Sequence, residues 1–233
     1  MTQYLRTGPQ TMFFFNSTKD VNAHCHDRSA KLVTLDLSEY NDCKLEREDQ
    51  QFMVGLHPWN TVDDEMYDTF DILSTAITDP RVVGIGEVGI DPLHGASVER
   101  QEQLLRYQLR VANEARLPVM FHIVRRYDIL IKLFKELKPV ASWAVHGFRS
   151  SPEVASQLAD LGIYMSIGLK FNPETLKAIP RNLILLETDE LPDSAIRDVI
   201  TAVAQVRGRS RRVVSRVARE NLRRFLNSGQ KSL

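Results

Sequence analysis

The sequence has few cysteines and no long apolar run, and these absences exclude several classes of protein. Its two cysteines, Cys25 and Cys43, show no Cys-x-x-Cys spacing and are too few for a disulfide framework, so both are predicted to be free thiols. No apolar run approaches the roughly 20 residues that span a bilayer. The N-terminus, Met1 to Gln10, is polar. We therefore expect a cytoplasmic protein with no membrane partner.

An excess of one charge is also absent, although the charges are unevenly distributed. Residues 1–100 carry 8 Lys and Arg against 17 Asp and Glu, whereas residues 101–233 carry 22 against 13. Four arginines recur along one helical face near the C-terminus: Arg212, Arg216, Arg219 and Arg223. The basic helix Arg207–Arg224 is predicted to be a solvated face that pairs with the acidic half. The alternative is a surface for phosphates or for an acidic protein partner.

The remaining composition, 43% hydrophobic and 26% charged over 233 residues, is typical of one globular domain, here residues 1–233. Eight short apolar runs have the character of strands: Thr11–Phe15, Leu32–Leu37, Phe52–Leu56, Val82–Gly86, Pro118–His122, Ser142–His146, Ile163–Ile167 and Leu183–Glu187. Amphipathic helical segments lie in most of the intervals, but the first two intervals lack a clear helix. This alternation predicts an α/β fold, a single (β/α) barrel with irregular early loops.

The stretch Val82–Asp91 contains both a glycine pattern and a carboxylate. Gly84, Gly86 and Gly89 match the G-x-G-x-x-G pattern, which binds a dinucleotide only where a helix opens at once. Pro92 follows instead, and the next helical pattern starts near Ser97, so dinucleotide binding is disfavoured. The glycines are interpreted as room for a group that approaches the backbone closely. Glu87 is then a carboxylate at the end of a buried strand.

Other strands also end on residues that bind metals or move protons. The residues at or just past these strand ends are His57, Glu87, His122, His146 and Asp189. In a (β/α) barrel the carboxyl ends of the strands share one face, where the active site is built. A single strand-end histidine is usually a hydrogen-bonded core residue, but three of the chain's six histidines at such positions favour a metal site. Imidazole and carboxylate together suit Zn²⁺, Mn²⁺ or Fe²⁺.

Five sequence blocks, in order, carry a resemblance to a known family. They are Gly55-Leu56-His57-Pro58-Trp59, Gly84-Ile85-Gly86-Glu87-Val88-Gly89-Ile90-Asp91, Phe121-His122-Ile123-Val124-Arg125, Val145-His146-Gly147-Phe148-Arg149 and Leu186-Glu187-Thr188-Asp189. The chain resembles the TatD-type metal-dependent deoxyribonucleases from about Phe52 to Phe225. The resemblance implies a distorted (β/α)8 TIM barrel of the metal-dependent hydrolase type, with one or two divalent ions (Zn²⁺, Mn²⁺ or Mg²⁺). It also implies hydrolysis of phosphodiester bonds, with DNA or another phosphodiester as substrate.

The resemblance also implies roles for single residues. Glu87 would bridge two metals, His122 and His146 would hold one of them, and Asp189 would complete the other. Glu87 and Asp189 are the predicted catalytic residues, because Asp189 would orient or deprotonate the attacking water. Substrate phosphate oxygens are expected to meet His57 and Arg125, and less directly Arg149 and Lys170.

The N-terminus departs from the family, which places His-x-His directly after the first strand. The predicted strand Met12–Phe15 is followed by Asn16 and Thr18, whereas His24 and His26 come eight residues later. We favour Asn16 and Thr18 as the equivalent positions, with the two histidines in a variable loop and a single metal held by the other ligands. The rival register places the loop histidines at the metal. If two ligands are lost, an alternative function is a catalytically weakened barrel that serves as a binding subunit.

Overall fold

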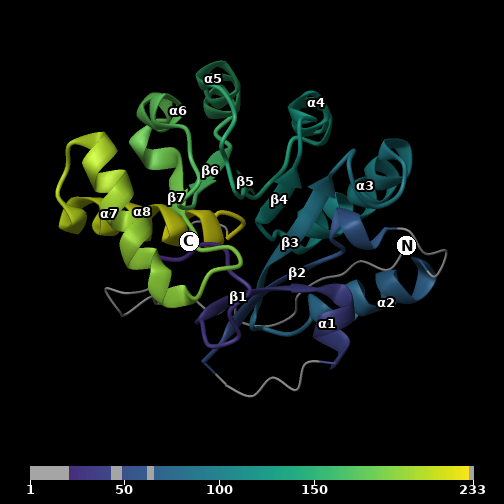
Figure 1. Cartoon of the computed structure of the whole chain (residues 1–233). Helices are drawn as coiled ribbons and strands as arrows, with labels where there is room; N and C mark the ends of the chain where they lie inside the picture. The colour runs from purple at the N-terminus through teal and green to yellow at the C-terminus, as the bar shows by residue number, and fades with distance from the viewer. Residues whose placement is uncertain (1–20, 43–48, 62–65, 231–233) are drawn as a thin grey trace.

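The computed structural model describes residues 21–42, 49–61 and 66–230. In these residues seven parallel strands form one sheet, in which the strands follow each other in sequence order. Figure 1 shows the sheet curled at the centre of the molecule. The strands are β1 (Leu32–Asp36), β2 (Gln51–Gly55), β3 (Val82–Ile90), β4 (Val119–Ile123), β5 (Trp143–Val145), β6 (Tyr164–Ile167) and β7 (Ile184–Leu186).

Helices connect the strands and lie around the outside of the curled sheet (Figure 1). They are α1 (Leu37–Asp42), α2 (Met66–Ala76), α3 (Val98–Ala115), α4 (Tyr127–Leu137), α5 (Pro152–Asp160), α6 (Pro173–Ala178), α7 (Ile196–Arg207) and α8 (Arg211–Leu226). Short 3-10 turns are η1 (Pro58–Asn60), η2 (Arg181–Leu183) and η3 (Asp193–Ala195). Because the strands are all parallel, their carboxyl ends meet at one face. No helix in the described part of the chain is long and apolar enough to cross a membrane.

The segment 21–26 joins the two edges of the sheet. On one side the Ala23 amide donates to the Leu186 carbonyl of β7 at 2.7 Å, and on the other the Thr34 amide of β1 donates to the Cys25 carbonyl at 2.9 Å. Isolated parallel bridges link Asn22 to Leu186 and Cys25 to Asp189. This segment therefore takes the place of the first barrel strand. The predicted strand Thr11–Phe15 lies outside the described residues.

Strand β3 is buried along its whole length and is longer than the sequence predicts. It continues beyond Gly86 to Ile90, so Glu87 lies within the strand and not at its end. The glycines of β3 allow the neighbouring strands to pack closely against it. A Cβ atom on Gly89 would lie 1.7 Å from the carbonyl oxygen of His122 in β4. The group that approaches these glycines is thus the neighbouring strand.

Serine and asparagine caps mark the starts of four helices. Ser97, Ser151, Asn172 and Ser210 each accept a hydrogen bond from a backbone amide of the helix that follows. The interval between β1 and β2 differs from the expectation, because it contains the short helix α1. Six residues are too few to display a helical period, which is why the sequence pattern misses it.

Candidate metal centre

The carboxylate of Glu87 lies at the centre of a ring of histidines. Glu87 is only 5% exposed and comes from β3. Its Oε1 atom lies 2.5 Å from His146 Nε2, 2.9 Å from His122 Nδ1 and 3.4 Å from His57 Nε2. The three histidines come from the ends of β5, β4 and β2. The predicted convergence of His57, Glu87, His122 and His146 is therefore present.

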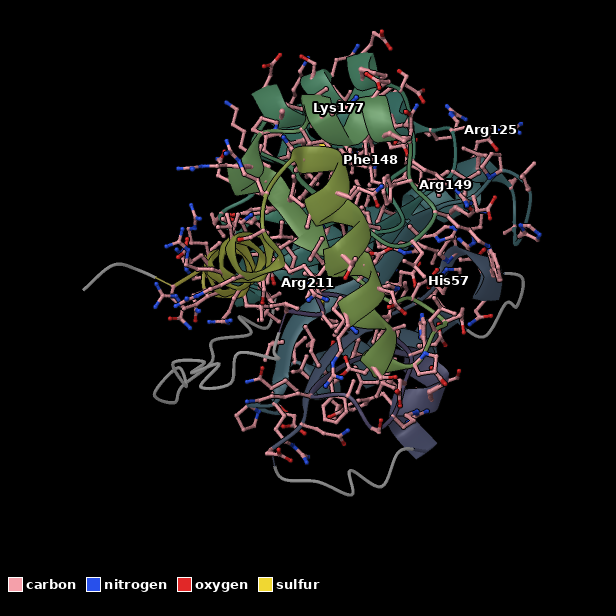
Figure 2. The ribbon with its side chains drawn as sticks, turned by 60° about the vertical axis from the view of Figure 1, so that its left-hand side comes forward. His57, Arg125, Phe148, Arg149, Lys177 and Arg211 are labelled. Carbon is pink, nitrogen blue, oxygen red and sulfur yellow. The ribbon has the colours of Figure 1, made fainter. Side chains whose placement is uncertain are left out.

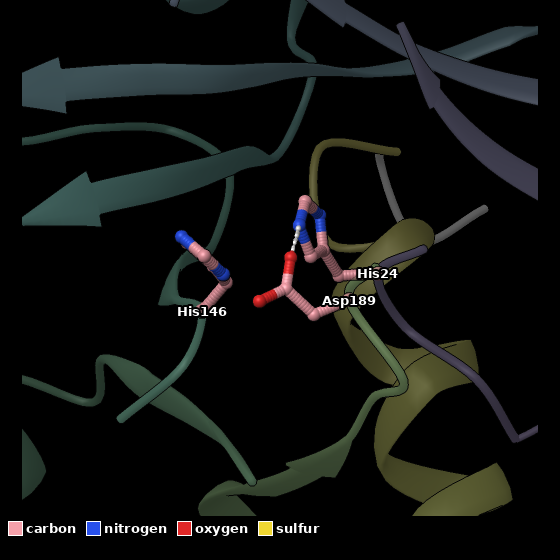
Figure 3. A group of neighbouring side chains, drawn as sticks. All are labelled: His24, His146 and Asp189. Carbon is pink, nitrogen blue, oxygen red and sulfur yellow. Dashed lines mark ion pairs between the residues drawn. The ribbon is translucent and has the colours of Figure 1, made fainter. Parts of the chain in front are cut away.

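The other oxygen of Glu87 faces a second pair of histidines. Oε2 lies 3.4 Å from His24 Nε2 and 3.5 Å from His26 Nε2. His24 Nε2 is also 3.6 Å from Oδ1 of Asp189, and Figure 3 shows this ion pair with His146 on the other side of the Asp189 carboxylate. Five of the six histidines in the chain thus surround Glu87, and they divide between its two oxygens.

The favoured assignment of His24 and His26 to a variable loop is wrong. Both lie beside Glu87, and His24 is fully buried, with Nδ1 3.0 Å from Thr34 Oγ1 on β1. Asn16 and Thr18, the positions favoured instead, lie outside the described residues. Nothing in the structure therefore assigns them a place at this site.

The segment before His24 is mostly polar, and composition alone therefore argues against a buried strand there. The contacts of its side chains remove this objection. Asn22 in this segment is polar and nearly buried, and its side chain is fully engaged. Its amide group donates to Thr188 Oγ1 and to Asp193 Oδ1, both at 2.8 Å, and its side-chain oxygen accepts from the Thr188 amide at 3.1 Å. A buried polar side chain is tolerated in a strand when its hydrogen bonds are made. The His-x-His spacing itself was the better signal.

The donor atoms of the site fit a divalent cation. Three buried imidazole nitrogens have no hydrogen-bond partner among the described residues: His24 Nε2, His122 Nε2 and His146 Nδ1. Such orphaned polar atoms are rare in protein interiors. Sets of three donors lie within 4.8 Å of one another: His24, His146 and Asp189; His24, His26 and Glu87; His57, Glu87 and His122; and His26, Asp189 and Glu190. Imidazole and carboxylate are ligands that Zn²⁺ and Mn²⁺ accept.

The charges of the site are set by the same contacts. Burial raises the pKa of Glu87, but His146, His24 and the hydrogen bonds from His122 and His146 outweigh burial and hold it well below its usual range. Burial lowers the pKa of His146, yet the Glu87 carboxylate raises it to about 9. The pKa of Asp189 is lowered, chiefly by the contact with His24. Both carboxylates are therefore negative at neutral pH and attract a cation.

Asp91 supports the site and was not predicted to do so. It is 2% exposed and lies one residue past the end of β3. Its Oδ2 atom accepts from Trp59 Nε1 at 2.6 Å and lies 3.5 Å from His122 Nε2, while its Oδ1 atom accepts from the Leu93 amide at 2.9 Å. The signal that could have found it is a carboxylate just past a buried apolar run, and Glu87 gives the same signal four residues earlier.

Glu187 is a second buried carboxylate for which the sequence predicted no role. Its Oε1 atom accepts from the Gly147 amide at 2.6 Å and lies 3.9 Å from His146 Nδ1. The contact joins the end of β7 to the loop after β5. Glu187 therefore fixes the turn that carries His146.

The cationic side chains predicted to meet substrate lie outside the inner cluster. Arg125, Arg149 and Lys170 are exposed, in the loops that follow β4, β5 and β6. In Figure 2, Arg125 and Arg149 lie on the same side of the molecule as His57. His57 alone of the predicted substrate contacts touches Glu87, and its Nδ1 atom accepts from the Trp59 amide at 3.2 Å. The arginines and the lysine are thus at the mouth of the site.

Known proteins are similar to this chain in sequence and in fold. A family model described as TatD related DNase matches residues 16–227. A protein of Klebsiella pneumoniae (strain 342) named 3'-5' ssDNA/RNA exonuclease TatD is 32% identical over 130 residues, which are 51% of this chain and 49% of that protein. An uncharacterized metal-dependent hydrolase of Bacillus subtilis (strain 168), YabD, is 30% identical over 145 residues, 58% of this chain and 56% of that protein. The chain spans about half the length of the curated relatives it matches.

Solved structures confirm the fold. The crystal structure of YJJV, a TatD homolog from Escherichia coli K12, superposes with a TM-score of 0.72 at 22% identity and covers 83% of this chain and 85% of that one. The predicted class, an α/β distorted (β/α)8 barrel of the metal-dependent hydrolase type, is therefore confirmed.

Proposed function

The chain belongs to the TatD related DNase family, and from this premise we propose that it is a metal-dependent hydrolase that cleaves phosphodiester bonds in single-stranded DNA. The observation that carries the proposal is the division of five histidines between the two oxygens of Glu87. One carboxylate with imidazoles on both oxygens suits a bridge between two cations. The printed name of the Klebsiella pneumoniae relative, an exonuclease for single-stranded DNA and RNA, supports the choice of substrate.

Glu87, His122 and His146 would hold one ion, and Glu87, His24 and His26 would hold a second, with Asp189 completing the set. Zn²⁺, Mn²⁺ and Mg²⁺ are the candidates for both positions. When bound, such ions lower the pKa of a coordinated water and offset negative charge on phosphate oxygens.

The remaining roles follow from position and charge. Asp189 is half exposed toward solvent and ionised, so its carboxylate accepts a hydrogen bond from the attacking water and orients it. His57 borders both Glu87 and the rim, where its imidazole donates to a phosphate oxygen. Arg125, and beside it Arg149 and Lys170, bind phosphates further along the strand as charged donors.

The placement of His24 and His26 weakens the alternative of a binding subunit without efficient catalysis. That alternative assumed that two histidine ligands are missing from the site. His24 and His26 lie beside Glu87 and supply both imidazoles. The basic segment Arg207–Arg224, which includes the end of α7 and most of α8, keeps a protein partner within the proposal. A cytoplasmic location also remains part of the proposal. In α8 Arg212, Arg216 and Arg223 are exposed or partly exposed. If they bind a protein and not DNA, Arg212→Glu with Arg216→Glu leaves the slope of log affinity for DNA against log salt unchanged.

The nuclease proposal is tested with purified protein and end-labelled single-stranded DNA. We expect release of nucleotides with Mn²⁺, Zn²⁺ or Mg²⁺, loss of release with a chelator, and recovery when metal is restored. Asp189→Ala should abolish activity. Asp198→Ala, an exposed carboxylate on α7, is the matched control and should leave activity unchanged. Full activity of Asp189→Ala would refute the site assignment.

A further inference from the structure

Most of the large exposed apolar side chains lie at the carboxyl-end face of the sheet, the face that carries the metal centre. In the described part of the chain five large hydrophobic side chains are strongly exposed: Trp59, Leu93, Val140, Leu169 and Leu191. All except Val140 lie in loops that follow the carboxyl ends of β2, β3, β6 and β7. Exposed apolar side chains that lie on one face often mark a binding surface, so these residues are suited to contact an apolar part of the substrate.

Trp59 is the largest of these side chains, and it is held rigidly. Its indole is 49% exposed, yet its Nε1 atom donates to Asp91 Oδ2 at 2.6 Å. The rings of His94 and His57 pack against it, with centroids 4.8 and 5.0 Å away. One edge is therefore fixed by a hydrogen bond to a buried carboxylate, while about half of the residue stays exposed to solvent.

The loop beneath Trp59 is also fixed. Gly95 has φ +77°, and a Cβ atom there would lie 2.0 Å from the Pro58 carbonyl oxygen, so the loops after β2 and β3 are in close contact. The buried side-chain amide of Gln101 donates to the carbonyls of Asp91, His94 and Ala96. A ring held in this way loses little conformational entropy when a ligand binds.

We propose that Trp59 is a stacking platform for a nucleobase of the substrate, and so determines specificity for single-stranded nucleic acid. The inference rests on the proposed function, because it places the phosphate next to that base at Glu87. His122 contacts both Glu87 and the indole, with ring centroids of His122 and Trp59 5.8 Å apart. A base must leave the duplex stack before it can lie on an indole face.

The charges across the mouth agree with this orientation of the strand. Arg125, Arg149 and Lys170 follow β4, β5 and β6, whereas Trp59 and Leu93 follow β2 and β3. When a base stacks on Trp59, the adjoining phosphates of the strand are directed toward Arg125, Arg149 and Lys170. Stacking on an aromatic face and a positively charged groove are the two elements by which proteins bind single strands without reading sequence.

The contributions of the base and of the phosphate are distinguished by measuring the binding of two ligands. Thymidine 5'-monophosphate and ribose 5-phosphate are titrated into Zn²⁺-loaded protein, and tryptophan emission and affinity are recorded. We expect thymidine 5'-monophosphate to quench Trp59 and ribose 5-phosphate to have no such effect; Trp143, the other tryptophan, is buried. Trp59→Ala should weaken the nucleotide about 5- to 100-fold and leave ribose 5-phosphate unchanged. Trp59→Phe, which keeps an aromatic face but loses the bond to Asp91, should retain part of the affinity.

The control variant and the possible outcomes separate this inference from the nuclease proposal. Val140→Ala removes an exposed apolar side chain away from the mouth and should bind both ligands as the wild type does. If Trp59→Ala weakens both ligands equally, Trp59 only positions Asp91, and the stacking inference is wrong. If the nucleotide binds as expected but single-stranded DNA is not hydrolysed, the stacking inference holds and the nuclease proposal fails. If DNA is hydrolysed but Trp59→Ala leaves the affinity ratio of the two ligands unchanged, the nuclease proposal holds and the stacking inference fails.

Discussion

Glu87 is a buried carboxylate whose two oxygens meet different sets of imidazoles. Burial raises the pKa of this group, yet the neighbouring histidines hold it well below the usual range. Because His24 and His26 contact one oxygen and His122 and His146 the other, removal of a ligand on one side should leave the other side intact. The two proposed metal positions should thus be separable by mutation.

His26→Ala should lose one of two bound metal ions. His26 contacts the Oε2 atom of Glu87 and is partly exposed, so the substitution leaves little buried volume empty. Metal content after saturation with Zn²⁺ and removal of free ion should fall from two per chain to one, measured by elemental analysis. The matched control is His94→Ala, a histidine that contacts Asp91 and not Glu87, which should keep two. Two ions in His26→Ala would contradict the assignment.

Asp79 provides a pH-dependent contribution to stability away from the site. Burial raises its pKa, but hydrogen bonds and charge from Arg81 outweigh burial and lower it. A lowered folded pKa gives stability that is present above the unfolded value, about 3.9, and is lost as pH falls through the folded value. Asp79→Ala should cost about 1–3 kcal/mol at pH 7.

Urea denaturation at pH 7 and at pH 3 measures this effect. The difference between Asp79→Ala and wild type should shrink at the lower pH, because the carboxyl group is then increasingly protonated. Asp198→Ala, which replaces an exposed carboxylate, should show no such trend. A difference that stays constant with pH would argue against the Arg81 contact as its source.

The secondary-structure elements were predictable to the extent that their signals are local. Helices α3, α5, α6 and α8 begin where a Ser or Asn cap stands before an amphipathic run, and the apolar runs of β2 to β7 are buried on both faces. The first strand position was not predictable by composition. The apolar run Phe13 to Phe15 gave a stronger strand signal than Val21–His26. The position of Val21–His26 depends on hydrogen bonds to β7 and β1, which leave no local pattern in the sequence.

The same limit applies to α8, whose polar anchor is invisible to hydrophobic periodicity. Val214, Leu222 and Phe225 are buried, whereas Val213 and Val217 are only partly buried. Asn221 is fully buried among them. Its position in the chain looks like part of the helix's polar pattern, and only the tertiary fold shows what its amide group contacts.

Asn221→Ala should destabilise the protein through the attachment of α8 to the barrel. The Asn221 amide donates to the carbonyls of Ile184 at 2.7 Å and Arg181 at 2.8 Å. The substitution leaves buried polar groups unsatisfied, so we expect a loss of about 2–4 kcal/mol in urea denaturation. Asn182→Ala, at an exposed position in η2, is the matched control and should change stability little. Equal effects of the two variants would contradict this role.

The whole barrel brings together metal donors from widely separated segments of the chain. His24 and His26 come from the segment that joins β7 to β1, Glu87 from β3, and Asp189 from the residues after β7. The Glu87 and Asp189 carboxylates repel each other across this interior. A bound cation would offset both charges and link the N-terminal segment to the opposite strands.

Metal binding should therefore raise the melting temperature of the whole chain. A ligand that binds only the folded state stabilises it by about 2.7 kcal/mol at 100 times its dissociation constant. For a chain of 233 residues this corresponds to a rise of about 5–10 °C. Thermal melts of protein treated with chelator, before and after addition of Zn²⁺ or Mn²⁺, measure the shift.

The size of that shift in variants tests whether the N-terminal segment is part of the linkage. His26→Ala removes a donor from the segment 21–26, so its melting temperature should rise less than that of the wild type at the same metal concentration. His94→Ala leaves all the contacts to Glu87 in place and should show the full rise. An equal rise in both variants would mean that the metal is held without the N-terminal segment, because the stabilisation by a ligand increases with the affinity that each donor adds to the folded state.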